Sequence, residues 1–389
     1  MRDDGHKPCG VLGLIGMHGC EDLAARTDYY LTKWRSESHP EGQLSMEDAL
    51  HIEPGRFQVK AKCPRFSTGE GKAVIQQSVR GYDLYILTDV FNYDVKYKMY
   101  GKEVPMSPDD HFQDLKRVIA ASGGKAHRIT VIMPMLYEGR QHRRFARESL
   151  DCALALRELT DMGVANIITF DAHDARVQNA IPLSGFENVQ PTYQMLKSLL
   201  RTIPDFTIDW DNMMVVSPDE GGMARCIYYS SVLGIDLGMF FKRRDYSRVV
   251  DGRNPIMQHE FLGGNVKGKD VIVVDDMISS GDSILGIAPI LKELGARRII
   301  MFATFGLFSS GLERFDEAYE KGLIHKIFTT NLIYRSDELK QKPWYQEVDM
   351  SKFIAYIIET LNYDRSISDL LDPAGRIRKL LDDRISSAE

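Results

Sequence analysis

Short runs of β-branched and apolar residues alternate with segments of helical periodicity along most of this chain. Residues 149–162 gather apolar side chains on one face, and residues 284–294 do the same before Gly295, a residue type common just past a helix end. Such alternation favours parallel sheets with helices on both faces. We therefore predict an α/β fold with strands at residues 11–15, 84–87, 129–133, 166–170, 213–217, 271–274, 299–304 and 326–329.

The length of 389 residues exceeds what one ordinary core accommodates, so we expect two domains. Ala-His-Arg-Ile at 126–129 and Ala-Arg-Arg-Ile at 296–299 both follow glycines, which indicates a duplicated α/β unit. Pro, Gly and Asn cluster at 185–191, so we predict domains of residues 1–187 and 188–389. Residues near 35–55 and 92–110 have little core-forming content and are predicted to be inserted loops.

Charge, hydropathy and cysteine usage exclude several classes of protein. A net charge of −6 gives no reason to expect nucleic-acid binding, and no apolar run approaches the roughly 20 residues that span a bilayer. The first ten residues include two acids and precede no long apolar stretch, so we expect no signal peptide. Five scattered cysteines without a Cys-x-x-Cys pair indicate reduced thiols and a cytoplasmic protein.

The most informative segment for function is residues 271–283, where an apolar run ends in Asp275 and Asp276 and leads through Ser-Ser-Gly-Asp-Ser into a helix. Ligands of open α/β sheets bind beyond the carboxyl ends of strands, and helix N-termini bind phosphate. Adjacent carboxylates suit vicinal sugar hydroxyls or Mg²⁺. Helix capping alone would also use Asp and Ser here, but the buried strand and paired acids favour a sugar-phosphate site. The residues of this predicted site are Asp275, Asp276, Ser279, Ser280, Gly281, Asp282 and Ser283. No Gly-Lys-Ser/Thr follows, so the loop is not a Walker A motif.

This loop resembles the ribose-phosphate loop of type I phosphoribosyltransferases. Further segments, in chain order, are similar to the ribose-phosphate pyrophosphokinase family: Arg-Phe-Ser-Thr-Gly-Glu at 65–70, Tyr-Glu-Gly-Arg-Gln at 137–141, Phe-Asp-Ala-His at 170–173, Ser-Pro-Asp-Glu-Gly-Gly at 217–222 and Phe-Lys-Arg-Arg at 241–244. The similarity reaches about residue 370. It implies two similar type I phosphoribosyltransferase-like domains, each a mostly parallel sheet flanked by helices. It also implies transfer of the diphosphoryl group of ATP to the anomeric hydroxyl of ribose 5-phosphate.

The resemblance assigns roles to individual residues. ATP binding is expected from Phe66, Thr68, Glu70, Arg140, Gln141 and His173. His173 and Asp219 are expected to hold Mg²⁺, and Asp219 also to contact the ribose. Lys242 and Arg244, with His173, are expected to be catalytic, because cations stabilise charge that develops on transferring phosphoryl oxygens. A solvated basic turn is the alternative for residues 242–244. A flexible loop is expected to follow them to about residue 267. In the family the loop equivalent to 66–70 works in a neighbouring subunit, which implies a homo-oligomer with shared active sites.

Some residues depart from the family pattern. Ser279 and Ser280 stand where an acid and Thr are usual, and Asp282 replaces Gly, placing a like charge beside the expected phosphate. Thr68 replaces Asn, and Phe145 stands where an acid is common. Two other functions compete with diphosphoryl transfer: a phosphoribosyltransferase that consumes phosphoribosyl pyrophosphate, and a non-catalytic regulatory subunit of a synthetase. Retention of the catalytic residues favours the synthetase.

Overall fold

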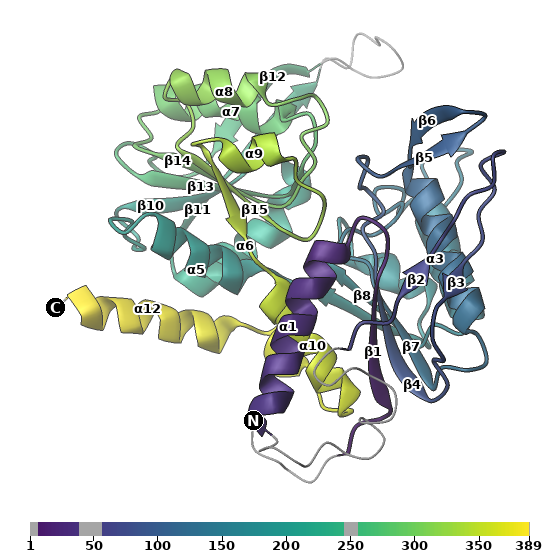
Figure 1. The fold of residues 1–389 in the computed structure, drawn as a ribbon. Helices are drawn as coiled ribbons and strands as arrows, with labels where there is room; N and C mark the ends of the chain where they lie inside the picture. Colours follow the sequence, from purple (N-terminus) through teal and green to yellow (C-terminus); the bar gives the residue numbers. More distant parts are fainter. Residues whose placement is uncertain (1–6, 39–56, 245–255, 389) are drawn as a thin grey trace. The chain divides into compact units, whose positions relative to one another are not determined.

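The computed structural model describes residues 7–38, 57–244 and 256–388, which fold into two compact units (Figure 1). The first unit is built from Met1–Gln190, Asn331–Tyr334 and Asp349–Asp372, and the second from Pro191–Thr330, Arg335–Val348 and Pro373–Glu389. Within the described ranges, every helix is too short or too polar to cross a lipid bilayer.

The first unit contains a sheet of five parallel strands in the order β1-β4-β7-β8-β9. Its strands are β1 (Val11–Gly16), β4 (Tyr82–Leu87), β7 (Arg128–Ile132), β8 (Asn166–Phe170) and β9 (Gly185–Val189). Every residue of β4 is buried, as expected for a strand inside a parallel sheet that is covered on both faces.

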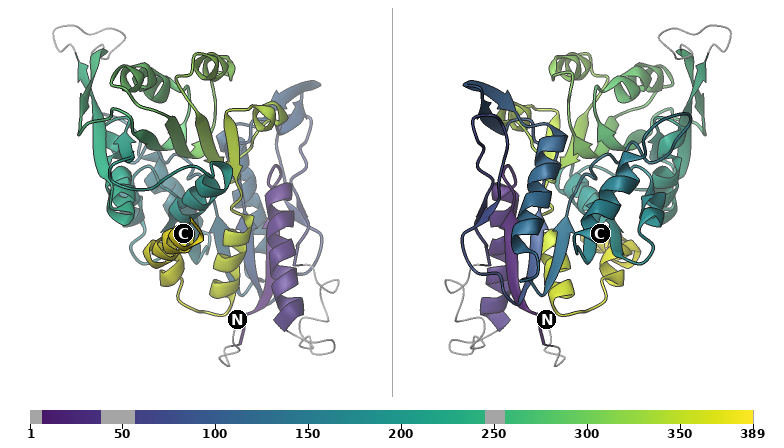
Figure 2. Two further views of the ribbon diagram at one scale, coloured as in Figure 1. Left: turned by 90° about the vertical axis from the view of Figure 1, so that its left-hand side faces the viewer. Right: turned by 90° about the vertical axis from the view of Figure 1, so that its right-hand side faces the viewer.

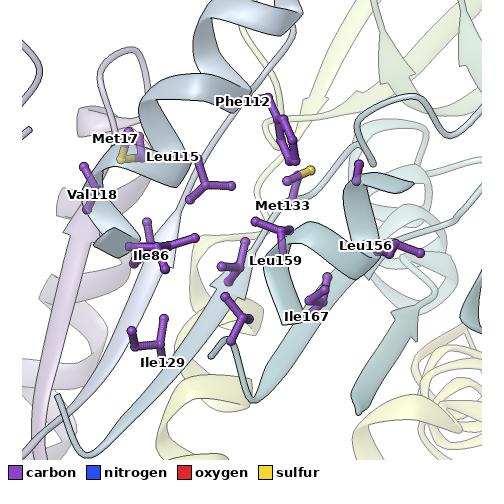
Figure 3. Packing of buried hydrophobic residues seen from close by; sticks show 14 of the residues in the cluster. Met17, Ile86, Phe112, Leu115, Val118, Ile129, Met133, Leu156, Leu159 and Ile167 are labelled. Carbon is purple, nitrogen blue, oxygen red and sulfur yellow. The ribbon is translucent and has the colours of Figure 1, made fainter. Parts of the chain in front are cut away.

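Helices cover both faces of this first sheet. On one face lie α3 (Pro108–Ser122) and α4 (Asp151–Asp161), and Figure 3 shows Ile86 and Ile129 of the sheet among side chains of these helices such as Leu115 and Leu159. The other face is covered by α1 (Glu21–Ser38) and α10 (Ser351–Asn362), which lie side by side. The smaller elements of this unit are β2 (Ala61–Lys62), β3 (Val74–Ile75), β5 (Lys96–Met99), β6 (Lys102–Pro105), the 3₁₀ helix Ala175–Ala180 and α11 (Ser368–Leu371).

The second unit contains a seven-stranded sheet in the order β12-β11-β10-β13-β14-β15-β16. Its strands are β10 (Met213–Ser217), β11 (Asp236–Arg244), β12 (Ile256–Leu262), β13 (Asp270–Ile278), β14 (Ile299–Gly306), β15 (Lys326–Thr330) and β16 (Tyr345–Val348). Only β12 runs antiparallel to its neighbour. All eight strands expected from the sequence are present in the two sheets, and the predicted α/β class is confirmed.

Helices also lie on both faces of the second sheet, as Figure 2 shows. The helices of this unit are α5 (Thr192–Thr202), the 3₁₀ helix Glu220–Gly222, α6 (Met223–Leu233), α7 (Asp282–Glu293), α8 (Glu313–Glu320), α9 (Asp337–Gln341) and α12 (Ala374–Ala388). The core on the side of α7 and α8 includes Val273, Ile287 and Phe315, whereas α12 contacts α5 and α6.

The similar segments at 126–129 and 296–299 each supply arginine to an ion pair with a buried aspartate of the neighbouring strand. In the first unit, Arg128 at the start of β7 donates two hydrogen bonds of 2.8 Å to Asp83 of the adjacent strand β4. In the second unit, Arg297 and Arg298 before β14 both donate to Asp270 of β13. Both aspartates are 0 % exposed. The arginines of the two similar segments therefore neutralise a buried carboxylate on the adjacent parallel strand in each sheet.

The first network also explains why a late segment of the chain belongs to the first unit. Asn362 of α10 donates to Asp83 at 2.9 Å, and Arg128 donates to the carbonyl of Leu361 at 2.7 Å. On α1, Arg35 donates to Asn362 at 2.6 Å. Because α10 supplies hydrogen-bond partners to this buried network, residues 349–372 belong to the first unit, although they follow the strands of the second unit in the sequence.

Three segments expected to be loops contain regular secondary structure. Residues 92–110 are not a loop: β5 and β6 form an antiparallel hairpin with Tyr100 and Gly101 in left-handed conformations, and α3 begins at Pro108. The alternation of Lys-Tyr-Lys-Met before Tyr-Gly carried this signal. The loop expected from 245 to 267 includes the strand β12. Of the other expected insertion, 35–55, residues 35–38 continue α1 and residues 39–55 lie outside the described ranges.

Candidate active site

In the second unit, β13 delivers two carboxylates near its carboxyl end. Asp276 is 4 % exposed, and its backbone N–H donates to the Asp275 carboxylate at 2.9 Å. Arg225 Nη1 lies 4.0 Å from Asp275 Oδ1, too far for a close ion pair. Burial and the adjacent charge of Asp276 raise the pKa of Asp275 well above its ordinary value. The ionised form of the Asp275 carboxyl is therefore disfavoured, and a nearby cation or donor hydroxyls would stabilise it.

The loop after β13 turns sharply at Gly281, which has φ +84° and precedes the first residue of α7. A Cβ at this position would lie 2.4 Å from Cζ of Phe315, so both the backbone angle and the core exclude a side chain. Ser279 and Ser309 share a hydroxyl hydrogen bond of 3.1 Å, and the Ser279 carbonyl accepts from the Ser309 N–H at 3.0 Å. This turn presents the N-terminus of a twelve-residue helix beside the loop hydroxyls.

Asp282 does not place an uncompensated charge at this loop. Its carboxylate accepts from Arg314 of α8 at 2.6 Å and from the Ser280 hydroxyl at 2.8 Å. The departure from the family pattern is therefore accompanied by a nearby cation. Sequence reasoning missed Arg314, because it lies 32 residues away from Asp282 and belongs to no motif.

Asp219 follows β10, the strand hydrogen-bonded to β13, so both chain segments leave the same edge of the sheet. Its side chain accepts from the Gly221 N–H at 3.0 Å, and its carbonyl accepts from the Ser217 hydroxyl at 2.6 Å. The acid is thereby fixed in an extended N-cap conformation before a short 3₁₀ helix. The structure brings Asp219, the acid pair and the serine loop to one end of the second sheet.

In the first unit, the turn after β8 carries His173 next to a second histidine. The rings of His142 and His173 are 5.4 Å apart, and His142 Nε2 lies 3.5 Å from Asp174 Oδ2. Asp174 also pairs with Arg176, whose hydrogen bonds lower the pKa of that carboxyl. Nδ1 of His142 is buried and has no hydrogen-bond partner among the described residues. Sequence reasoning missed His142, although it directly follows the predicted Arg140-Gln141 pair.

Arg140 and Gln141 lie in the turn after β7. Arg140 is exposed, whereas the Gln141 amide donates to the Ser149 carbonyl at 2.8 Å. In this conformation Gln141 supports the loop of residues 141–149, and Arg140 offers a guanidinium to solvent. The exposed Phe145 ring contacts the guanidinium of Arg143, whose Cζ lies 4.4 Å from the ring centre.

The segment carrying Phe66 forms a tight reversal in which the Phe66 N–H donates to the Glu70 carbonyl at 2.7 Å. The Phe66 ring is 55 % exposed, so it is not a core residue. Thr68 donates its hydroxyl to the Glu70 carboxylate at 2.9 Å. From the β5–β6 hairpin, the Tyr100 N–H donates to the Ser67 carbonyl at 2.8 Å, so the hairpin supports this loop.

Lys242 and Arg244 lie on β11, where their backbones pair with His259 and Ile256 of β12. The side chains of residues 242–244 and the whole of residues 245–255 lie outside the described part of the structure. The catalytic role of these two cations stays a prediction from the sequence.

Comparison with known proteins identifies relatives over most of this chain. Residues 34–163 match the model of the N-terminal domain of ribose phosphate pyrophosphokinase, and residues 250–372 match that of the phosphoribosyl synthetase-associated domain. A ribose-phosphate pyrophosphokinase of Vibrio parahaemolyticus is 28% identical over 337 residues, covering 86% of this chain and 96% of that protein. One from Mycoplasma genitalium is 29% identical over 315 residues, covering 79% of this chain and 85% of that protein.

The fold matches as well. The crystal structure of phosphoribosylpyrophosphate synthetase from Mycobacterium smegmatis superposes with a TM-score of 0.70 at 23% identity, covering 91% of this chain and 99% of that one. Two matching domain models in the expected order, full-length relatives and a shared fold agree with the motifs that the structure gathers at the sheet ends. The chain belongs to the ribose-phosphate pyrophosphokinase family.

Proposed function

We propose that this protein is an enzyme that transfers the diphosphoryl group of ATP to the anomeric hydroxyl of ribose 5-phosphate, giving 5-phosphoribosyl 1-diphosphate and AMP. The observation that carries the proposal is the β13–α7 junction, where the acid pair Asp275–Asp276, loop hydroxyls and a helix N-terminus meet in a member of this family. Asp275 and Asp276 accept hydrogen bonds from the ribose hydroxyls. Ser279, Ser280, Gly281 and Ser283 surround the 5-phosphate at the N-terminus of α7.

The remaining roles follow the family motifs. Phe66 stacks on adenine, because its exposed ring is available for such contact, and Thr68 and Glu70 accept or donate at the base. Arg140 and His173 contact the phosphates of ATP, and Gln141 holds the turn that carries Arg140. Lys242 and Arg244 stabilise the charge that develops on the transferred group.

Magnesium fits the carboxylates of the second unit. Among the described residues no three His, Cys, Asp or Glu side chains gather as a metal cage. Mg²⁺, however, is commonly bound through one or two carboxylates together with waters and substrate phosphates. Burial and the charge of Asp276 raise the pKa of Asp275, so a bound divalent cation would favour the ionised form of this carboxyl. As the family resemblance implies, we assign direct or water-mediated contacts with Mg²⁺ to Asp219 and, in the first unit, to His173. When bound, it would neutralise the phosphate charge of ATP.

The identity of the nucleotide product tests the reaction. Purified protein with ATP, Mg²⁺ and ribose 5-phosphate should form AMP, resolved from ADP by ion-exchange chromatography. Formation of ADP would indicate an ordinary kinase. Absence of ATP consumption at every inorganic phosphate concentration, with ribose 5-phosphate still bound, would favour the regulatory subunit instead. Asp276→Asn is the matched control, and it should abolish ribose 5-phosphate use while leaving ATP binding intact.

We further place the enzyme in the cytoplasm as a homo-oligomer whose ATP site receives the Phe66–Glu70 loop of a second copy, as the family resemblance implies. No pair of the five cysteines, all of which lie in described segments, forms a disulfide, in keeping with a reducing compartment. Mixing inactive Glu70→Ala with inactive Lys242→Ala protein should restore part of the activity, since one site in the mixed oligomer would be intact. Exchanged subunits that stay inactive would contradict the shared site.

A further inference from the structure

The loop after β14 lies against the start of the proposed sugar-phosphate loop. Because β14 is the parallel neighbour of β13, the carboxyl ends of both strands lie at the same edge of the second sheet. Beyond this edge, the N–H groups of Leu307 and Phe308 donate to the Ile278 carbonyl at 2.9 and 3.1 Å. The Ser309 N–H donates to the Ser279 carbonyl at 3.0 Å. Backbone hydrogen bonds therefore hold Ser309 beside the first serine of the proposed phosphate loop.

The residue before Ser309 fixes the direction of this loop. Phe308 has φ +45°, a left-handed conformation that residues other than glycine rarely adopt. Its ring is 8 % exposed and meets the Phe315 ring edge-on, with 5.0 Å between the ring centres. Burial of this ring offsets the unfavourable backbone angle, whereas the next residue, Ser309, is exposed. The turn therefore buries Phe308 and leaves Ser309 at the surface.

The hydroxyl groups of Ser309 and Ser279 form a pair that is open to solvent. Their Oγ atoms lie 3.1 Å apart, and this hydrogen bond is exposed. Two hydroxyls joined by one hydrogen bond carry two protons, and the bond between them uses only one. The pair can therefore donate its second proton to an incoming acceptor. Because Ser279 belongs to the proposed phosphate loop, a phosphate bound there would lie within reach of the Ser309 hydroxyl as well.

The second serine of the proposed phosphate loop uses its hydroxyl in a different way. The Ser280 hydroxyl donates to the Asp282 carboxylate at 2.8 Å and accepts from the Asp282 N–H at 3.4 Å. Arg314 holds the same carboxylate through a hydrogen bond of 2.6 Å. In this arrangement the Ser280 proton is directed at a carboxylate and not at a ligand. The exposed hydroxyl of Ser309 supplies a donor that Ser280 does not.

We propose that Ser309 binds the 5-phosphate of ribose 5-phosphate beside Ser279 and thereby favours phosphorylated ribose over ribose. The inference rests on the proposed function, because that function places the phosphate at the N-terminus of α7. Phosphate oxygens are charged acceptors, and hydrogen bonds to charged groups are stronger than those between neutral groups. Ribose without its phosphate would not contact Ser309. A helix and a strand separate this residue from the phosphate loop in the sequence, so no contiguous motif indicated it.

Calorimetric titration with ribose 5-phosphate tests the proposal in phosphate-free buffer that contains Mg²⁺ and α,β-methylene-ATP, whose carbon bridge blocks diphosphoryl transfer. Ser309→Ala should weaken ribose 5-phosphate binding by about tenfold or more and leave binding of the nucleotide analogue unchanged. Ser309→Thr keeps a hydroxyl and should bind as wild type, as should Ser310→Ala, which changes the exposed neighbouring serine. Ribose, measured by competition, should bind Ser309→Ala and wild type equally. Unchanged ribose 5-phosphate affinity in Ser309→Ala, or an equal loss for ribose, would overturn the proposal.

A double variant separates direct contact from an effect that acts through Ser279. Ser279→Ala/Ser309→Ala should bind ribose 5-phosphate several-fold more weakly than Ser279→Ala, and equal affinities would overturn the proposal. If Ser309→Ala fails to fold in thermal melting, Ser309→Asp decides, because its carboxylate should repel the phosphate and abolish binding; unchanged affinity would overturn the proposal.

The same titrations distinguish this inference from the proposed function. Wild-type protein that binds ribose 5-phosphate but forms no AMP from ATP would refute the proposed reaction and leave the role of Ser309 standing. Wild-type protein that does not bind ribose 5-phosphate would refute both. Normal AMP formation by the wild type, with Ser309→Ala binding ribose 5-phosphate as tightly, would refute the role of Ser309 alone.

Discussion

Replacing Gly281 by Ala should destabilise the second unit through two separable effects. The left-handed backbone, φ +84°, costs a non-glycine residue about 1–2 kcal/mol. The added Cβ would also lie 2.4 Å from Cζ of Phe315, a ring only 1 % exposed that cannot move freely. It stacks on Trp344 with 5.6 Å between ring centres and meets Phe308 edge-on at 5.0 Å. Overpacking of this kind adds about 1–3 kcal/mol, so we expect a total loss of about 2–5 kcal/mol.

Gly268 provides the matched control for this variant. It has φ +79° in the same unit, and nothing lies within 4 Å of a Cβ built there. Gly268→Ala should therefore lose only the backbone contribution of about 1–2 kcal/mol in urea-induced unfolding. The double variant Gly281→Ala/Phe315→Leu replaces the ring by a smaller side chain. Its loss of unfolding free energy should be smaller, by about 1 kcal/mol or more, than the sum of the losses in the two single variants. Equal losses for the two glycine variants, with no coupling to Phe315, would refute the steric argument.

Three other perturbations follow from the contacts. Asp275→Asn should raise the thermal unfolding midpoint at pH 7–8, because a carboxyl with a raised pKa destabilises the folded state once it ionises. This increase in the midpoint should shrink as the pH falls toward about 4, where the carboxyl is protonated in both the folded and the unfolded state. A midpoint difference that does not change with pH would contradict the raised pKa of Asp275. Arg128→Ala leaves Asp83 buried without its cation and should cost about 3–5 kcal/mol of unfolding free energy, whereas a loss below about 1 kcal/mol would show that the other hydrogen bonds to Asp83 suffice. Arg314→Ala should raise KM for ribose 5-phosphate several-fold by freeing the charge of Asp282, and Arg314→Ala/Asp282→Ala should restore it; an unchanged KM in the single variant would remove Arg314 from the account.

Much of the fold was predictable from the sequence because most strands coincide with a local run of apolar and β-branched residues. The run at 271–274 is apolar throughout, as a strand buried on both faces must be, and the structure places it inside β13. The strand continues to Ile278, beyond the acid pair, which the pattern of polar residues concealed. The association of α10 with the first unit was not predictable, since it depends on buried hydrogen bonds such as that from Asn362 to Asp83 across 279 residues.

In the candidate site, too, local features were predictable from the sequence, whereas contacts between distant segments were not. The acid pair and the glycine turn were identified from the sequence because strand, loop and helix are contiguous there. Partners supplied by other elements were not identified: Arg314 from α8 pairs with Asp282, and His142 lies beside His173. Neither contact has a local sequence signature, because each arises only when separate segments meet. The Phe66 ring could not be assigned to core or surface until its exposure was known.

Phosphorus NMR of the reaction products tests the central claim most directly. With Mg²⁺, ATP and ribose 5-phosphate, diphosphoryl transfer moves the β- and γ-phosphorus atoms together, so the product should show two mutually coupled resonances of a diphosphate ester, an unchanged 5-phosphate and the single resonance of AMP. A coupled pair that remains on the adenine nucleotide as ADP, or spectra unchanged across phosphate concentrations, would contradict the account.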